Sequence, residues 1–92
     1  MNKLVTIVIT SYRSRELILS HIKILNKNIK NVKIIIVENS RDKILQNIIQ
    51  RKFKNVQIFL QKNIGFGSAI NYGAKFVKTK YFFYNESGYK NI

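Results

Sequence analysis

The chain has 92 residues, which limits it to one small domain that buries only about 60 to 65% of its unfolded surface. Its 46% hydrophobic content excludes a disordered tail, and the absence of cysteine excludes disulfides and thiolate metal sites. The net charge of +13 is compatible with binding to a nucleic acid or to an anionic membrane surface. The lysines are nevertheless spread along the chain without a basic block, so we expect mainly a solvated basic surface.

The first third of the chain predicts a strand, a helix and a second strand. Residues 4–10 (LVTIVIT) form a β-branched run typical of a strand, and a polar loop follows at residues 10–14. Ser14 is a candidate N-cap for a helix that runs to about Lys27 and has one apolar stripe. Residues 32–38 form a second apolar run, which indicates a strand buried on both faces of a parallel sheet.

The same alternation continues to residue 84. Ser40 and Asp42 are candidate caps for a second helix, and residues 56–60 (VQIFL) predict a third strand. A glycine-containing loop at residues 61–67 leads into a third helix, whose inner stripe from Phe66 to Val77 includes small residues that allow close approach to the sheet. These are Ala69, Gly73 and Ala74. Residues 81–84 (YFFY) predict a fourth strand.

The order of these elements predicts the fold class. Strands and helices alternate with connections of two to six residues, which predicts right-handed crossovers and a parallel sheet. We therefore expect an α/β protein with a parallel sheet of about four strands and helices on both faces. Residues 1–92 show no linker, repeat or second domain.

Polar side chains follow the first two strands, which should be neighbours in the sheet. Ligands of open parallel sheets bind at the carboxyl ends of the strands. Tyr12 is suited to stack on a base, Glu38 to accept a hydrogen bond from a ring N–H or a ribose hydroxyl, and Arg13 to meet a phosphate. Equally, Tyr12 and Glu38 are compatible with ordinary loop residues, with Glu38 balanced by Arg13 or Arg41. The candidate nucleotide-binding residues here are Thr10, Tyr12, Arg13, Glu38 and Asn39.

The glycine loop does not carry a dinucleotide fingerprint. After Gly65 and Gly67, the third glycine of G-x-G-x-x-G would stand at Ile70, and the loop after the first strand has no glycine. A Walker loop is excluded because the chain has no G-K-[ST] sequence. Two interpretations remain: a tight turn into the third helix, or a backbone that approaches a ligand.

The sequence indicates no catalytic residue. His21 has no histidine or cysteine partner and is expected to be a packed or surface residue. The chain has four acids, Glu16, Glu38, Asp42 and Glu86, and they are too scattered for a catalytic or metal-binding pair. Glu86, just after the predicted fourth strand, is the one candidate metal ligand.

Three sequence blocks together resemble the N-terminal half of a family 2 glycosyltransferase. They are residues 5–13 (VTIVITSYR), 32–40 (VKIIIVENS) and 63–73 (NIGFGSAINYG), in the order and at the spacing of that family. The resemblance implies the Rossmann-like, three-layer half of a GT-A fold and the transfer of a sugar from a nucleotide-sugar donor to a glycan or lipid-linked acceptor.

The resemblance also assigns candidate site residues. Thr10 and Tyr12 correspond to the tip of the first strand that contacts the base. Glu38 corresponds to the acid that contacts the base, which is usually aspartate in the family. The resemblance further places the loop from Asn63 to Gly67, including Gly65, and Asn71 on the nucleotide side of the cleft.

The chain departs from the family pattern at two points. The family's Asp-x-Asp or Asn-x-Asp motif places a divalent metal, Mg or Mn, whereas this chain reads Tyr84-Asn85-Glu86-Ser87, which puts metal binding in doubt. The sequence ends at Ile92, although such a domain needs roughly twice this length, so we expect a truncated product that is inactive alone. The fourth strand would then leave Phe82 and Phe83 on an uncovered edge that favours self-association.

The partners and location follow from these expectations. We expect a nucleotide-sugar donor, a glycan or lipid-linked acceptor in polysaccharide synthesis, and no nucleic acid. The alternative function is a small basic α/β module that binds nucleic acid. Residues 4–10 are too short to cross a bilayer and no cleavable signal segment follows them, so we expect a cytoplasmic protein that can lie at the inner face of the membrane.

Overall fold

A computed structural model describes residues 5–62, 65–79 and 81–88 of the chain, with residues 66 and 85–88 described by their backbone alone. Within these ranges, every helix is too short or too polar to cross a membrane.

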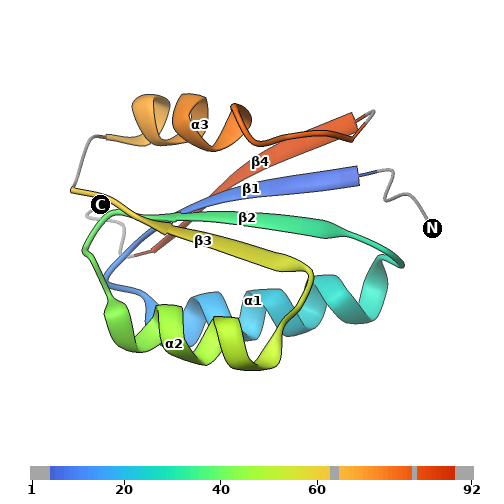
Figure 1. Ribbon diagram of the computed structural model, residues 1–92, viewed down its shortest axis with the longest axis horizontal. Coiled ribbons are helices and arrows are strands. Elements are labelled where there is room, and N and C mark those ends of the chain that lie inside the picture. Colours follow the sequence, from blue (N-terminus) through green and yellow to red (C-terminus); the bar gives the residue numbers. More distant parts are fainter. Residues whose placement is uncertain (1–4, 63–64, 80, 89–92) are drawn as a thin grey trace.

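A four-stranded parallel sheet forms the centre of the molecule (Figure 1). Its strands lie in the order β3 (Val56–Leu60), β2 (Lys33–Glu38), β1 (Val5–Tyr12) and β4 (Tyr81–Gly88). Each neighbouring pair is parallel, as the short strand-to-helix connections predict. The carboxyl ends of β1 and β2 therefore lie side by side at one edge of the sheet.

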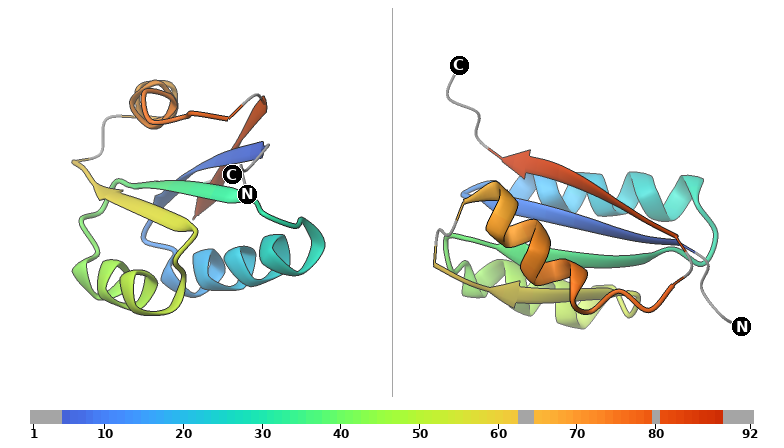
Figure 2. Two further views of the ribbon diagram at one scale, coloured as in Figure 1. Left: turned by 45° about the vertical axis from the view of Figure 1, so that its right-hand side comes forward. Right: turned by 90° about the horizontal axis from the view of Figure 1, so that it is seen from above.

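Helices cover both faces of this sheet (Figures 1 and 2). Helices α1 (Arg15–Asn28) and α2 (Lys43–Lys52) lie on one face, and α3 (Phe66–Ala74) lies on the other. This arrangement confirms the expected three-layer, Rossmann-like α/β fold.

Alternate residues of the central strands contribute to two separate cores. On the face covered by α1 and α2, Ile9 and Ile36 pack with buried side chains of both helices. On the opposite face, Val8 and Ile35 pack beneath α3 with Ile70. Because both faces are covered, these strands are apolar at consecutive positions rather than at every second one.

Helix α3 approaches the sheet closely at Gly73, as the small residues on its inner stripe predict. A Cβ atom at this position would lie 2.6 Å from Cγ1 of Val8 and 3.2 Å from Cγ2 of Val37. Beside this contact, the rings of Phe59 and Phe76 stack with their centroids 4.3 Å apart. The helix thus approaches the sheet closely where it has no side chain, and the turn that follows the helix packs against β3 through the Phe76 ring.

Three predicted boundaries are wrong by about two to four residues. Strand β1 continues to Tyr12 instead of ending at Thr10, and β4 continues to Gly88 instead of ending at Tyr84. Both extensions have one cause, because the β1–β4 ladder runs without a break from the Val5↔Tyr81 pair to the Tyr12↔Gly88 pair. Pairing with a neighbouring strand overrides the polar composition of these ends.

The third wrong boundary is the end of α3. This helix ends at Ala74 and does not reach Val77. The N–H groups of Phe76 and Val77 donate to carbonyls three residues earlier, each at 3.1 Å, so the α-helix gives way to tighter turns.

Strand β4 is an edge of the described sheet, as expected. It pairs with β1, and its four aromatic side chains are exposed, from 40% at Phe82 to 61% at Phe83. The edge therefore presents apolar surface to solvent.

Candidate functional site

The ends of β1 and β2 are joined by backbone hydrogen bonds. Ser11 and Glu38 are in register, and the N–H of Asn39 donates to the carbonyl of Ser11 at 2.8 Å. The N–H of Gln61, just after β3, donates to the carbonyl of Glu38 at 2.8 Å. The carboxyl ends of β1, β2 and β3 are therefore connected by hydrogen bonds, with Glu38 at the centre. These carboxyl ends form the polar edge of the sheet, which is distinct from the lateral edge at β4.

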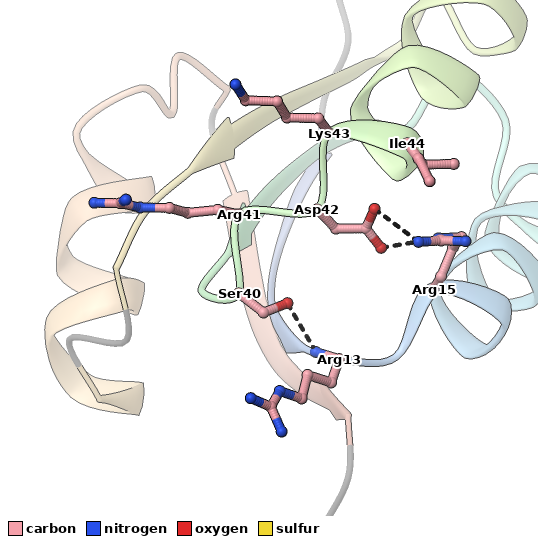
Figure 3. Close-up of a pocket in the computed structure, with 7 residues that line it drawn as sticks. All are labelled: Arg13, Arg15, Ser40, Arg41, Asp42, Lys43 and Ile44. Atoms are coloured by element: carbon pink, nitrogen blue, oxygen red, sulfur yellow. Dashed lines mark hydrogen bonds and ion pairs between the residues drawn. The ribbon is translucent and has the colours of Figure 1, made fainter.

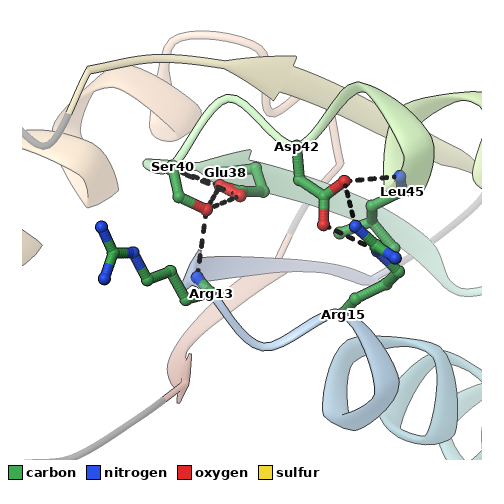
Figure 4. Close-up of polar contacts among 6 residues, drawn as sticks. All are labelled: Arg13, Arg15, Glu38, Ser40, Asp42 and Leu45. Carbon is green, nitrogen blue, oxygen red and sulfur yellow. Dashed lines mark hydrogen bonds and ion pairs between the residues drawn. The ribbon is translucent and has the colours of Figure 1, made fainter.

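The carboxylate of Glu38 is buried and is held by Ser40 (Figure 4). The Glu38 residue is 1% exposed, and its Oε2 atom lies 2.5 Å from the Ser40 hydroxyl. The backbone N–H of Ser40 also donates to this carboxylate. In the described part of the chain, Glu38 has no ion pair, so the interpretation in which Arg13 or Arg41 balances it is wrong.

Ser40 links the two strand tips through its side chain. Its hydroxyl oxygen accepts a hydrogen bond from the backbone N–H of Arg13 at 3.0 Å while the hydroxyl proton is directed to Glu38. Ser40 therefore does not cap α2, although the sequence made it a candidate. Asp42 does so instead, because its Oδ1 atom accepts from the N–H of Leu45 at 3.0 Å.

Two buried polar atoms beside Glu38 have no hydrogen-bond partner among the described residues. They are the hydroxyl of Ser11, which is 2% exposed, and Oδ1 of Asn39, which is 6% exposed. Buried polar atoms of this kind are nearly always paired in proteins. The edge thus holds a carboxylate, a hydroxyl and an amide oxygen with unused hydrogen-bonding capacity.

Ser11 is a candidate site residue that the sequence analysis missed. Residues two apart on a strand point to the same face of the sheet. Ser11 therefore shares the face of Ile7 and Ile9 on β1, and Glu38 shares the face of Ile34 and Ile36 on β2. Both lie on the face covered by α1 and α2. The register of β1 with β2 places Ser11 opposite Glu38. This pairing could have been predicted from the sequence only if β1 were known to continue to Tyr12.

The remaining candidates on β1 lie around this edge. Thr10 is buried and, by the alternation of the strand, faces α3. Tyr12 is half-buried at the end of the strand, and the Arg13 guanidinium lies 5.1 Å from the centroid of its ring. Arg13 itself is exposed and has a positive φ of 51°.

An open pocket of about 600 Å³ lies next to this edge (Figure 3). It is formed by the loops that follow β1 and β2 and by the first turns of α1 and α2. Four of its lining residues are cationic and one is acidic. The lining consists of Arg13, Arg15, Ser40, Arg41, Asp42, Lys43 and Ile44.

Arg15 and Asp42 form an ion pair within the pocket. Nε and Nη2 of Arg15 lie 2.9 and 3.1 Å from the two carboxylate oxygens. Partial burial opposes ionisation of Asp42, but hydrogen bonds from Arg15 and the Leu45 backbone outweigh it, so the pKa of Asp42 lies below its ordinary value. The hydrogen bond with Asp42 raises the pKa of Arg15. Both groups are charged at neutral pH.

The glycine loop lies at the start of α3, and its described residues do not line this pocket. Gly65 takes the N-cap position with a φ of 84°, which favours glycine and supports the tight-turn interpretation. Gly67 and Asn71 are exposed on the helix. Asn63 lies outside the described residues.

The described side chains do not assemble a divalent-metal site. Among them, no three His, Cys, Asp or Glu side chains are close enough to hold one. The Asp42 carboxylate is occupied by Arg15 in a predominantly cationic pocket. The backbone of Glu86 pairs with Thr10 within β4, not beyond it, and its side chain lies outside the described part.

The fold and the polar edge define the class of the protein. An all-parallel sheet between two helical layers, with polar groups at the carboxyl ends of adjacent strands, is the arrangement of Rossmann-like ligand-binding domains. The family described as glycosyl transferase family 2 matches residues 6–86. The chain therefore belongs to this family, and the match does not favour the nucleic-acid alternative. A comparison with curated proteins found no match.

Proposed function

We propose that the chain binds the nucleoside of a nucleotide-sugar at the ends of β1 and β2. In this proposal it serves as the donor-binding half of a glycosyltransferase that acts on a glycan or lipid-linked acceptor. The observation that carries the proposal is the buried carboxylate of Glu38 beside the unpaired polar atoms of Ser11 and Asn39, in a chain of this family.

Glu38 has unused acceptor capacity. An ionised carboxylate offers about four acceptor positions, and the two donors of Ser40 use about half of them. Ring N–H groups and ribose hydroxyls are donors that would use the rest. Such hydrogen bonds are stronger at a buried edge than in water because the local dielectric constant is low.

Ser40 controls access to Glu38 in this arrangement. Because the Glu38 residue is 1% exposed, a ligand can reach its carboxylate only after a neighbouring group moves, and the Ser40 side chain, which is hydrogen-bonded to the carboxylate, is the group that would turn away. The rotation breaks the bond from the Arg13 N–H to the hydroxyl, which frees that N–H to face the ligand. The proposal therefore includes a local opening of the loop after β2.

The other partners belong to the same proposal. We place the protein in the cytoplasm, where its positive charge suits the anionic inner face of the membrane and a lipid-linked polysaccharide acceptor. Sugar transfer would require catalytic groups outside the described residues. The exposed edge of β4 would support self-association or contact with another polypeptide.

Calorimetry with a panel of nucleoside diphosphates tests the proposal. Glu38→Gln keeps the size of the side chain but removes its charge, and we expect binding to weaken by about 10- to 100-fold, the value of a charged hydrogen bond. Glu16→Gln is the matched control because Glu16 is exposed on α1 and the charge change is identical. Equal affinity of folded Glu38→Gln and wild type would reject the proposal.

A further inference from the structure

The lateral edge at β4 carries a contiguous group of exposed apolar side chains. The aromatic residues at positions 81–84 are all exposed, and they follow one another along the strand. The other exposed large apolar residues of the described chain, Leu17, Ile24 and Ile44, are separated on two helices. Single apolar residues are common on protein surfaces, whereas a contiguous patch marks an interaction surface.

The aromatic side chains of β4 point to both faces of the sheet. Phe83 is in register with Ile7, which lies in the core beneath α1 and α2. Tyr84 is in register with Val8, which lies in the core beneath α3. A helix packed on one face would contact only half of these rings, whereas a strand added beside β4 would bring side chains against both faces. The patch therefore fits a strand as its partner.

The opposite lateral edge, at β3, does not offer such a surface. Val56 and Ile58 are buried, and the Phe59 ring stacks on Phe76, so β3 has no exposed large apolar side chain. Natural edge strands are often protected from pairing by lysine or proline. The chain has 17 lysines and arginines, yet the eight residues of β4 include none, and the chain has no proline. The surface that complements β4 is therefore a second β4.

We propose that two copies of the chain associate through their β4 strands, which pair in antiparallel orientation about a two-fold axis normal to the sheet. The pairing joins two four-stranded sheets into one continuous sheet. It is closed, because each copy uses the same edge once and leaves its β3 edge outside the interface.

The positions of the aromatic residues select one register. An axis normal to the sheet keeps each face on its own side, so every residue pairs with a residue of the same face. With the axis at Phe83, this residue pairs with Phe83 of the partner subunit, and Phe82 pairs with Tyr84 of the partner subunit. An axis at Phe82 would place Tyr84 opposite residue 80, which precedes β4. The register centred on Phe83 keeps every aromatic residue opposite a residue of β4, and cross-strand aromatic pairs stabilise a sheet.

The apolar area predicts a reversible dimer. An aromatic side chain buries about 150 to 250 Å², so four that are about half exposed would bury on the order of 400 Å² per copy. The total of about 800 Å² from two copies lies at the low end of the range for specific interfaces, where transient complexes occur. Two copies of charge +13 also repel each other, and salt screens this repulsion. We therefore expect the dimer fraction to rise with both protein and salt concentration.

Single-cysteine variants test the register, because the native chain has no cysteine. The Cβ atoms of directly opposed antiparallel residues lie about 4.5 to 5.5 Å apart, close to their separation in a disulfide. We expect Phe83→Cys to form a covalent dimer when its thiols are oxidised with diamide. Its side chain is exposed, so the variant should keep the fold, which circular dichroism verifies.

Tyr81→Cys is the matched control. Residue 81 lies on the same face of the same strand and is also exposed, at 50%. In the proposed register the two copies of residue 81 are displaced by about 13 Å along the strand, too far for a disulfide. We expect this variant to give about tenfold less covalent dimer, or lower still.

Sedimentation of the wild-type protein over a series of concentrations measures the association itself. We expect a monomer–dimer equilibrium without larger species. A monomer at every protein and salt concentration would overturn the proposal and leave the β4 edge to a different polypeptide. Growth beyond a dimer would also overturn it, because open stacking of sheets does not follow from two-fold pairing. Equal cross-linking of Phe83→Cys and Tyr81→Cys would reject the register and with it the two-fold pairing.

The dimer can be tested apart from the proposed function. Antiparallel pairing directs the polar edges of the two copies to opposite ends of the joined sheet, so each copy keeps its own Glu38 edge. Nucleoside affinity should therefore be the same in the cross-linked Phe83→Cys dimer and in its reduced form. Loss of nucleoside binding on cross-linking would contradict this geometry, whereas weak binding in both forms would bear only on the proposed function.

Discussion

Strands β2 and β4 have similar apolar sequences but opposite surroundings. Ile34, Ile35 and Ile36 on β2 are 0% exposed, whereas the four aromatic residues of β4 are 40 to 61% exposed. The difference arises from position, because β2 lies between two strands and two helical layers and β4 pairs with β1 alone. Hydrophobic composition thus produces a core only where neighbours cover the strand.

The largest expected effect is the loss of a core side chain from β2. Ile36→Ala removes buried methyl and methylene groups and leaves a cavity, so we expect a loss of about 2 to 5 kcal/mol in the free energy of unfolding. Phe83→Ala on β4 should cost less than about 0.5 kcal/mol, since its side chain is 61% exposed. Urea denaturation measures both, and similar losses would mean that β4 is covered in solution.

The second prediction concerns the contact of α3 with the central strands. Gly73→Ala would place a Cβ atom 2.6 Å from the Val8 side chain, so we expect a loss of about 1 to 3 kcal/mol from overpacking. Gly67→Ala in the same helix has open space and is expected to stabilise it by about 0.5 to 1 kcal/mol. Thermal melts that show equal shifts for the two variants would contradict the close approach of α3.

The third prediction concerns Asp42 at the start of α2. Asp42→Ala removes the bond to the Leu45 N–H and should cost about 1 kcal/mol, whereas Asp42→Asn keeps a capping oxygen and loses only the charge. The lowered pKa of Asp42 means that its ionised form stabilises the fold above about pH 4 and that this contribution is lost on further acidification. Acid titration of stability should therefore be flatter in Asp42→Asn than in wild type.

Phe83→Lys should cause the smallest change in the free energy of unfolding. It should nevertheless cause a clear change in self-association of the protein. A charge on the exposed edge should reduce concentration-dependent self-association in analytical ultracentrifugation. Ile24→Lys is a matched control because Ile24 is similarly exposed, at 56%, on α1. If Ile24→Lys reduced association as much as Phe83→Lys, general charge repulsion and not the β4 edge would explain the result.

Local patterns were enough to predict the elements and the class of fold. The β-branched runs that became β1 and β2, and the apolar stripes of α1 and α2, reflect the periods of strands and helices, which depend only on nearby residues. Asp42 was predicted as a helix cap for the same reason, since its bond to Leu45 spans three residues. These features could therefore be predicted from the spacing of residues along the chain.

Contacts between distant segments determined the lengths of the strands and the composition of the candidate site. The ladder between β1 and β4 extended both strands, and the register of β1 with β2 placed Ser11 beside Glu38. Ser40 bonds to Glu38 and Arg13, and the pocket combines the loops after two strands. By itself the sequence determined which segments are strands and helices, because hydrophobic periodicity is local. Only the tertiary structure decided which polar groups share the edge, because strand register joins residues that lie far apart in the chain.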